Sequence, residues 1–104
     1  MADAIEARLQ KILPQAPQVI VWGTGQLAMK LLVETSLGKA NIGAFVDNNP
    51  INHGKMLRGV KISPPGALTG LDGPILITTI LHQQAIAEQI QSMGLKNEIV
   101  FLQE

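Results

Sequence analysis

The residues best suited to chemistry in this sequence form a glycine-rich segment, Gly23-Thr-Gly25-Gln-Leu-Ala28, which has the form GxGxxA. It directly follows the apolar run Val19-Ile-Val-Trp22. In a strand-to-helix turn of this form, Gly23 takes the backbone geometry of the turn, Gly25 lets a pyrophosphate approach the main chain, and Ala28 lets the helix pack close to the sheet. The helix N-terminus then offers free N–H groups and a positive dipole end to phosphate. The pattern predicts a phosphate-binding corner; the alternative is a tight turn that uses its glycines only for packing.

An acidic residue, Asp47, closes the next apolar run, Ile42-Gly-Ala-Phe-Val46. It stands about 20 residues beyond the glycine segment, where an acid binds the ribose of a dinucleotide. A carboxylate there repels a 2′-phosphate, and no arginine lies beside Asp47, so the pattern favours NAD over NADP. The same geometry fits a UDP-sugar or another ribose-bearing nucleotide. Asp-Asn-Asn-Pro is also a good turn sequence without a ligand.

Two threonines, Thr78 and Thr79, lie at the carboxyl end of the third apolar run, which begins at Ile75. The carboxyl ends of the strands in an open parallel sheet face the binding crevice, so Thr79 is a candidate ligand contact. The alternative is that Thr79 caps the following helix. His82, in the first turn of that helix, is a further candidate or a solvated histidine. We expect Trp22 to belong to the core.

The sequence offers no recognisable catalytic machinery. It has no cysteine, and its two histidines, His53 and His82, are far apart and joined by no carboxylate cluster, so we predict no metal site. The absence of tyrosine removes the Tyr-Lys acid–base pair of short-chain dehydrogenases. No nucleophile elbow and no GxxxxGK[ST] loop is present. A binding module, or a fragment of a larger transferase, fits these residues better than an independent enzyme.

Composition points to one globular domain. The chain has 104 residues, of which 46% are hydrophobic and 15% charged, with a formal net charge of zero. That balance gives no attraction to nucleic acid or to an anionic membrane. The N-terminal segment lacks the features of a signal peptide, and the apolar runs are too short to span a membrane. We therefore expect a cytoplasmic protein.

Helical and strand-like patterns alternate along the chain, which implies parallel strands joined by crossovers. Together they predict an α/β fold: a small Rossmann-like, doubly wound, mainly parallel sheet of four to five strands, with a truncated second half. Residues 1–18 form an N-terminal helix and connector, and residues 19–104 form the Rossmann-like nucleotide-binding domain. We expect helices over 2–13, 27–37 and 82–93, with Asp3 capping the first and Gly38 ending the second. The expected strands cover 19–22, 42–46, 75–78 and 99–102. A weak strand region over 56–62 and a turn with one helical turn over 64–68 complete the prediction.

Three segments carry a resemblance to a known group of proteins: VIVWGTGQLAMKLL, GAFVDNNP and HGKMLRGVKISPPGAL. The chain resembles the Rossmann-like accessory domains of bacterial sugar-modifying enzymes. These include the N-terminal domain of β-helix sugar O-acetyltransferases and the C-terminal domain of sugar C-methyltransferases. In the acetyltransferases this domain holds the UDP part of a UDP-sugar. The resemblance implies that Gly23, Thr24, Gly25 and Gln26 meet the phosphates and that Asp47 and Asn48 meet the nucleoside.

These observations support two hypotheses from different classes. The first is a nucleotide- or nucleotide-sugar-binding module for NAD or a UDP-sugar, associated with carbohydrate or cell-envelope biosynthesis as part of a larger methyltransferase or acyltransferase. The second is a Rossmann-like structural or interaction domain that has lost its ligand. An NAD-dependent oxidoreductase fits less well because the acid–base residues are missing. A neighbouring domain or a second copy are the expected partners, the latter through residues 99–102 if they form a sheet edge.

Overall fold

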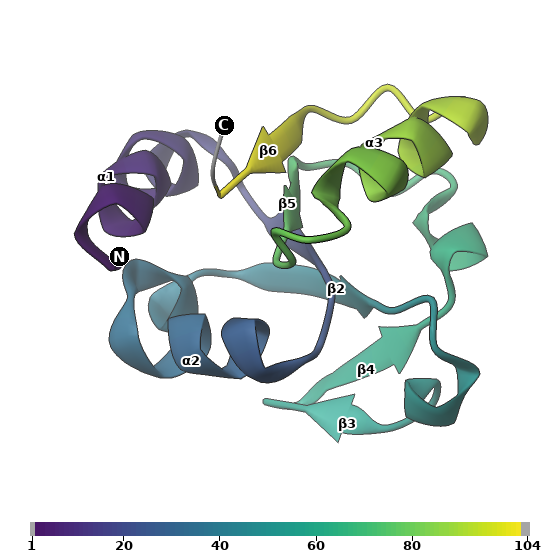
Figure 1. Ribbon diagram of the computed structural model, residues 1–104, viewed down its shortest axis with the longest axis horizontal. Helices are drawn as coiled ribbons and strands as arrows, with labels where there is room; N and C mark the ends of the chain where they lie inside the picture. The colour runs from purple at the N-terminus through teal and green to yellow at the C-terminus, as the bar shows by residue number, and fades with distance from the viewer. Residues whose placement is uncertain (1, 103–104) are drawn as a thin grey trace.

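The computed structural model describes residues 2–102, with the side chains of residues 4–102, and its centre is a six-stranded sheet (Figure 1). The strand order is β3-β4-β2-β1-β5-β6. The five strands other than β3 run parallel, and β3 pairs with β4 in the antiparallel direction. The strands are β1 (Val19–Trp22), β2 (Ile42–Val46), β3 (Met56–Leu57), β4 (Val60–Ser63), β5 (Ile75–Ile77) and β6 (Ile99–Phe101).

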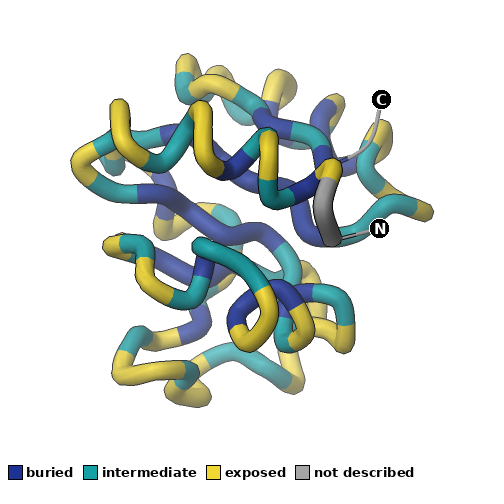
Figure 2. Tube along the Cα trace, turned by 90° about the vertical axis from the view of Figure 1, so that its left-hand side faces the viewer, coloured by how far each residue is buried: buried dark blue, intermediate teal, exposed yellow. Residues whose placement is uncertain are grey.

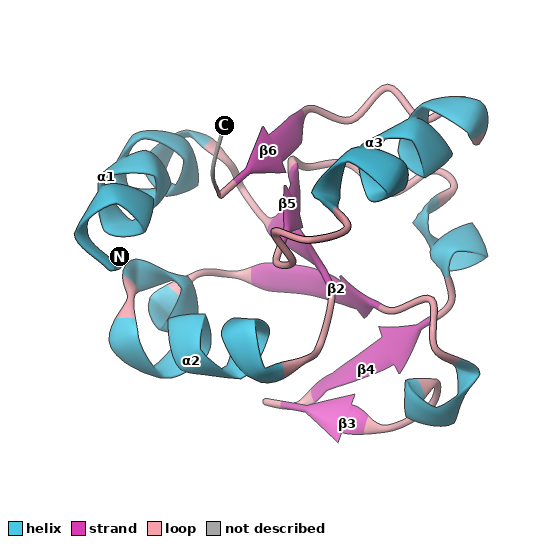
Figure 3. Cartoon of the chain, in the orientation of Figure 1, coloured by secondary structure: helices cyan, strands magenta, loops and turns pink. Residues whose placement is uncertain are grey.

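Helices lie on both faces of this sheet (Figure 3). The α-helices of the described residues are α1 (Ala2–Ile12), α2 (Gln26–Glu34) and α3 (Gln83–Ser92). Short 3₁₀-helices connect them to the strands: η1 (Leu13–Gln15), η2 (Ser36–Lys39), η3 (Pro50–Asn52) and η4 (Pro65–Leu68). The side chains of α1 and α2 share one core cluster, and those of α3 and η4 share the other. This arrangement confirms the predicted small Rossmann-like, doubly wound α/β fold.

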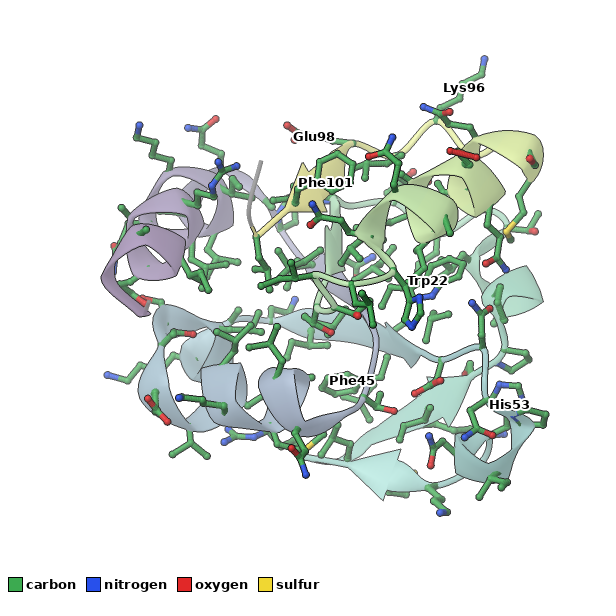
Figure 4. All side chains as sticks on the ribbon, in the orientation of Figure 1. Trp22, Phe45, His53, Lys96, Glu98 and Phe101 are labelled. Atoms are coloured by element: carbon green, nitrogen blue, oxygen red, sulfur yellow. The ribbon has the colours of Figure 1, made fainter. Side chains whose placement is uncertain are left out.

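The two core layers follow from the alternation of side chains along each buried strand. In β1, Val19 and Val21 face α1 and α2, while Ile20 and Trp22 face α3. In β2, Phe45 lies in the same layer as Val21. Figure 4 shows Trp22 in the half of the molecule that holds α3 and Phe45 in the half that holds α2. Buried segments accordingly run through the middle of the chain trace, with exposed turns around them (Figure 2).

The expected number of strands, four to five, is too low. The weak strand region over 56–62 is a hairpin of two strands, β3 and β4, which pair in the register Leu57 to Val60. The turn between them uses Arg58 and Gly59, whose φ angles are +51° and +80°. These left-handed conformations match the twist of a tight hairpin. The region therefore contributes two strands to the sheet, of which β4 is the parallel partner of β2.

The predicted end of the second helix is also wrong. Helix α2 stops at Glu34, because the Thr35 hydroxyl donates to Leu31 O at 2.6 Å and accepts from Leu37 N at 3.2 Å, which starts η2. Gly38 is not a left-handed helix stop. A Cβ built on Gly38 would lie 2.0 Å from Leu32 O, so glycine is needed there for space.

Helix α1 completes the core layer that also contains α2. Ile5 and Leu9 are buried in the same cluster as Val19 and Val21. Glu6 Oε1 accepts from the backbone N–H of Ser36 at 2.8 Å, which connects α1 to η2. The predicted cap at Asp3 falls on a side chain outside the described residues. Within residues 2–102, no helix has the length and apolar character needed to cross a membrane.

Candidate functional site

A cleft of about 590 Å³ opens at the carboxyl ends of β1 and β5. The strand order places β2 on one side of β1 and β5 on the other, so the chain reverses its progress across the sheet at β1. Open α/β sheets bind their ligands outside the strand ends at this kind of reversal. The seven residues predicted to contact a nucleotide line the cleft, as does the further candidate His82: Gly23, Thr24, Gly25, Gln26, Asp47, Asn48 and Thr79.

The first glycine of the corner is fixed by its neighbours. Gly23 has a φ of +117°, and a Cβ built on it would lie 2.6 Å from Thr78 Oγ1. Thr78 is 3% exposed, and its hydroxyl lies 2.9 Å from Gly23 O and 3.1 Å from Trp22 O. Gly23 N donates to Val46 O at 2.7 Å. The turn is therefore held by both strands that flank β1.

At Gly25, by contrast, the surrounding residues do not require a glycine. Gly25 is the N-cap residue of α2, with an ordinary φ of −85°, and a Cβ built on it would have no atom of the described residues within 4 Å. No side chain of the described residues caps this end of α2, and its first turn holds no acidic residue. The start of the helix thus presents main-chain groups to the cleft, and a larger residue at Gly25 would cover them.

Asp47 faces this corner from the end of β2. Its Oδ2 accepts from the Thr24 hydroxyl and from Asn52 Nδ2 at 3.2 Å, and its Oδ1 accepts from Asn49 N at 2.8 Å. Burial raises the pKa of Asp47, but the hydrogen bonds from Thr24, Asn49 and Asn52 outweigh it and hold the pKa below its usual value. Asp47 is therefore ionised at neutral pH. His53 Nε2 lies 2.7 Å from Asp47 O and helps to hold the same loop.

The remaining candidates lie on the α3 side of the cleft. Thr79 is half-buried and does not cap α3, because the N-cap position belongs to His82, which makes no side-chain cap bond. His82 is thus one residue before the helix rather than in its first turn, and it is exposed. Trp22 is 1% exposed and belongs to the core, as predicted.

One feature that sequence reasoning missed is the partner of Asn48. Its amide exchanges two hydrogen bonds with that of Gln89, on α3, each 3.0 Å long. Gln89 lies in a polar stretch of helix, so only the tertiary fold identifies it as part of the cleft. Leu27, Ile80, Leu81, Ala85 and Ile86 add apolar surface to the cleft walls.

The electrostatic character of the cleft comes from one carboxylate and from main-chain dipoles. No lysine or arginine is among the residues that line it in the described part of the chain. A phosphate would meet the amides at the start of α2, and a polyol would meet Asp47. In residues 2–102, no group of three or more potential metal ligands comes together.

The fold and the cleft at its strand reversal define a small Rossmann-like α/β domain. Comparison with known families makes the assignment more specific, since residues 15–101 match the sequence profile described as C2185-like, N-terminal. The chain belongs to this C2185-like N-terminal domain family. The comparison with curated proteins found no match.

Solved structures contain the same fold. The chain is similar to a crystal structure of RSP in complex with beta-NADH, with a TM-score of 0.61 and 20% sequence identity. The match covers 86% of this chain and 46% of that one, so the chain spans less than half the length of this neighbour. At this identity the likeness shows the fold. The resemblance to sugar-modifying enzymes stays a prediction.

Proposed function

We propose that this domain binds a pyrophosphate-containing ribonucleotide, NAD or a UDP-sugar, in the cleft at the ends of β1 and β5. The observation that carries the proposal is the placement of Gly25 and Asp47 at one cleft, an uncapped helix start beside an ionised carboxylate. The complex of the structural neighbour RSP with beta-NADH supports it.

Gly25 supports the phosphate part of the proposal. Neither its φ nor its surroundings require glycine, whereas close approach of a pyrophosphate to the main chain does. Gly23, Thr24 and Gln26 border the same corner. Among residues 2–102 no lysine or arginine lines the cleft, so the amides at the start of α2 would carry the interaction.

Asp47 supports the ribose part. A carboxylate offers about four acceptor positions, and Asp47 already receives hydrogen bonds from the Thr24 hydroxyl and backbone, from Asn49 and from Asn52, so a ribose hydroxyl would bind in place of the Thr24 hydroxyl. A negative charge here disfavours a 2′-phosphate, and we expect NAD to bind better than NADP. Thr79, which follows β5, lines the same cleft, and we expect it to contact the other end of the ligand.

A ligand titration with matched glycine variants tests this proposal. We expect NADH or a UDP-sugar to raise the melting temperature, since a ligand at a hundred times its Kd stabilises the folded state by about 2.7 kcal/mol. Gly25→Ala should weaken binding at least about tenfold, because the methyl group blocks the approach of the phosphate.

Gly66→Ala is the control for this variant. Gly66 also has an ordinary φ, and no atom in the described part of the chain lies within 4 Å of a Cβ built on it, but Gly66 is on η4 and does not line the cleft. Equal binding by the Gly25→Ala and Gly66→Ala variants would contradict the proposed phosphate position.

One observation favours the second candidate function, a structural or interaction domain without a ligand. Asp47 already accepts hydrogen bonds from Thr24, Asn49 and Asn52, so it also serves to hold two loops together. If this is its whole role, none of NAD, NADP and UDP-sugars will move the melting temperature, and the only effect of Asp47→Asn will be a loss of stability.

We extend the proposal to the setting in which the domain works. The motif resemblance to accessory domains of sugar-modifying enzymes suggests a role in carbohydrate or cell-envelope biosynthesis beside a methyltransferase or acyltransferase unit. The UDP-sugar arm of the titration tests this part: binding of NADH with no response to UDP-sugars would argue against it.

A further inference from the structure

Four donors from the described residues fill the acceptor positions of the Asp47 carboxylate. A carboxylate offers about four such positions. Asp47 receives hydrogen bonds from the hydroxyl and the backbone N–H of Thr24, from Asn49 N at 2.8 Å and from Asn52 Nδ2 at 3.2 Å. A hydroxyl group of a ligand therefore reaches this carboxylate only by exchange with one of these donors.

The donors differ in their position relative to the cleft. Asn49 and Asn52 belong to the loop that follows Asp47 itself, and neither is among the described residues that line the cleft. Thr24 lies 23 positions before Asp47 in the sequence, in the glycine corner after β1, and it does line the cleft. Thr24 is thus the donor that a ligand in the cleft meets at this carboxylate.

Of the two Thr24 donors, the hydroxyl is the one that can leave without a change of the backbone. The main chain of the corner is held in place, since Gly23 N donates to Val46 O at 2.7 Å. The Thr24 side chain is half-buried and belongs to no helix or strand. Rotation about its Cα–Cβ bond, from one staggered position to another, is enough to move the hydroxyl away from Asp47.

Exchange of one hydroxyl for another changes the free energy little. A ribose hydroxyl that binds Asp47 replaces a hydrogen bond of the same chemical kind. A ligand without this hydroxyl leaves the bond from Thr24 in place. Asp47 therefore rewards the ribose hydroxyl much less than a carboxylate with an open acceptor position would, while its charge still repels a 2′-phosphate.

We propose that Thr24 is a specificity-determining residue, which competes with the ribose of the ligand for Asp47 and makes the cleft almost indifferent to ribose and deoxyribose. The inference rests on the proposed function and deepens it, because it states which sugars the site accepts. An acid at the end of the second strand normally serves to bind the ribose hydroxyls. Here the adjacent glycine corner supplies a hydroxyl of its own that weakens this selection.

Calorimetric titration of the whole chain with ADP and UDP, each compared with its 2′,3′-dideoxy analogue, tests the competition. We expect the wild type to bind the ribose and dideoxy forms with affinities within about threefold of each other. Thr24→Val keeps the shape of the side chain and removes its hydroxyl, so a ribose hydroxyl then gains a hydrogen bond at an open acceptor position. The preference for the ribose form should rise about fivefold or more in this variant.

Two further variants serve as controls. Thr24→Ser keeps the hydroxyl and should retain the wild-type preference. Thr69→Val is the matched control for the exchange of threonine by valine, because Thr69 is exposed at the end of η4 and does not line the cleft. Thermal melts establish that each variant is folded.

The outcomes separate this inference from the proposed function. A ribose preference in Thr24→Val no larger than that of the wild type would overturn the competition and leave nucleotide binding intact. Binding of neither ADP nor UDP would remove both proposals.

A measurement on the wild-type chain gives a second readout that does not depend on any variant. Three-bond scalar couplings of Thr24 report the rotamer of its side chain. We expect the rotamer to change when the ribose form of the nucleotide binds and to stay the same when the dideoxy form binds. The same Thr24 rotamer in the free and the ribonucleotide-bound protein would overturn the proposed exchange.

Discussion

The hydroxyl of Thr78 lies 2.9 Å from the carbonyl oxygen of Gly23, and this contact joins the end of β5 to the glycine corner after β1. The same hydroxyl excludes a side chain at Gly23, since a Cβ there would lie 2.6 Å from it. The position of the corner is therefore set by a residue 55 positions away in the sequence.

Replacement of Thr78 by valine should destabilise the fold. Valine keeps the shape of threonine but leaves the carbonyl groups of Trp22 and Gly23 without this donor, which costs about 1–2 kcal/mol for buried groups. Urea denaturation measures the loss, and Thr78→Ser, which keeps the hydroxyl, is the control. A valine variant as stable as the wild type would show that the hydroxyl does not hold the corner.

At Arg58, the cost of a left-handed backbone conformation can be compared with the gain from the hydrogen bonds of its side chain. Its φ of +51° is unfavourable for any residue that has a Cβ. Its guanidinium donates hydrogen bonds to Leu32 O at 3.0 Å and to Gly38 O at 3.3 Å. Arg58→Ala loses the hydrogen bonds and keeps the strain, whereas Arg58→Gly loses both. We expect the glycine variant to be about 1 kcal/mol more stable than the alanine variant in chemical denaturation. The reverse order would mean that the turn does not hold Arg58 in this conformation.

Gly38 should tolerate no side chain. A Cβ at this position would approach Leu32 O to 2.0 Å, so Gly38→Ala must displace η2 from the end of α2. Overpacking of this kind costs about 1–3 kcal/mol, and we expect the upper end of that range because the obstructing atom belongs to the backbone. Gly66→Ala, in open space, should change the unfolding free energy by less than about 0.5 kcal/mol. Similar values for the two variants would contradict the predicted close approach.

The pH dependence of stability should carry the signature of Asp47. Its folded-state pKa lies below the usual value, so its contribution is complete above the unfolded-state pKa of about 4 and is lost as the pH falls through the lower folded-state value. Asp47→Asn should therefore flatten the loss of stability below about pH 4. Glu6, whose pKa is lowered by Ser36, contributes in the same direction, so Glu6→Gln serves as the comparison. If the Asp47→Asn variant lost stability below about pH 4 as the wild type does, other groups would be responsible for this loss.

The sequence predicted the strands that carry strong local signals. β1 and β2 begin and end where expected, because each is an apolar, β-branched run bounded by turn residues. The hairpin of β3 and β4 gives only one weak strand pattern in the sequence, because β3 has two residues and Met56 within it is exposed. The sequence pattern places the end of α2 too late, because Leu37 keeps helical spacing and is buried, yet it belongs to η2.

Some residues of the candidate site can be identified from local sequence patterns, and others only from the fold. Gly23, Gly25 and Asp47 were identified because their types and spacing form a local pattern. The roles of Thr24, Asn49 and Asn52 as donors to Asp47 depend on how the loops close, and no periodicity encodes them. Gln89 joins the cleft only because the fold brings α3 to the loop after β2, where Gln89 meets Asn48, so one sequence without the fold gives no reason to choose it over Gln91.

The lining of the cleft, which holds no lysine or arginine in the described chain, also has a kinetic consequence. Fast, electrostatically steered capture of an anion requires a surface potential from cationic side chains and declines steeply with ionic strength. The main-chain dipoles at a helix terminus act only over a short range, about one helical turn. A phosphate-bearing ligand should therefore associate at an ordinary, diffusion-and-orientation rate that added salt hardly changes, and its residence time will set its affinity.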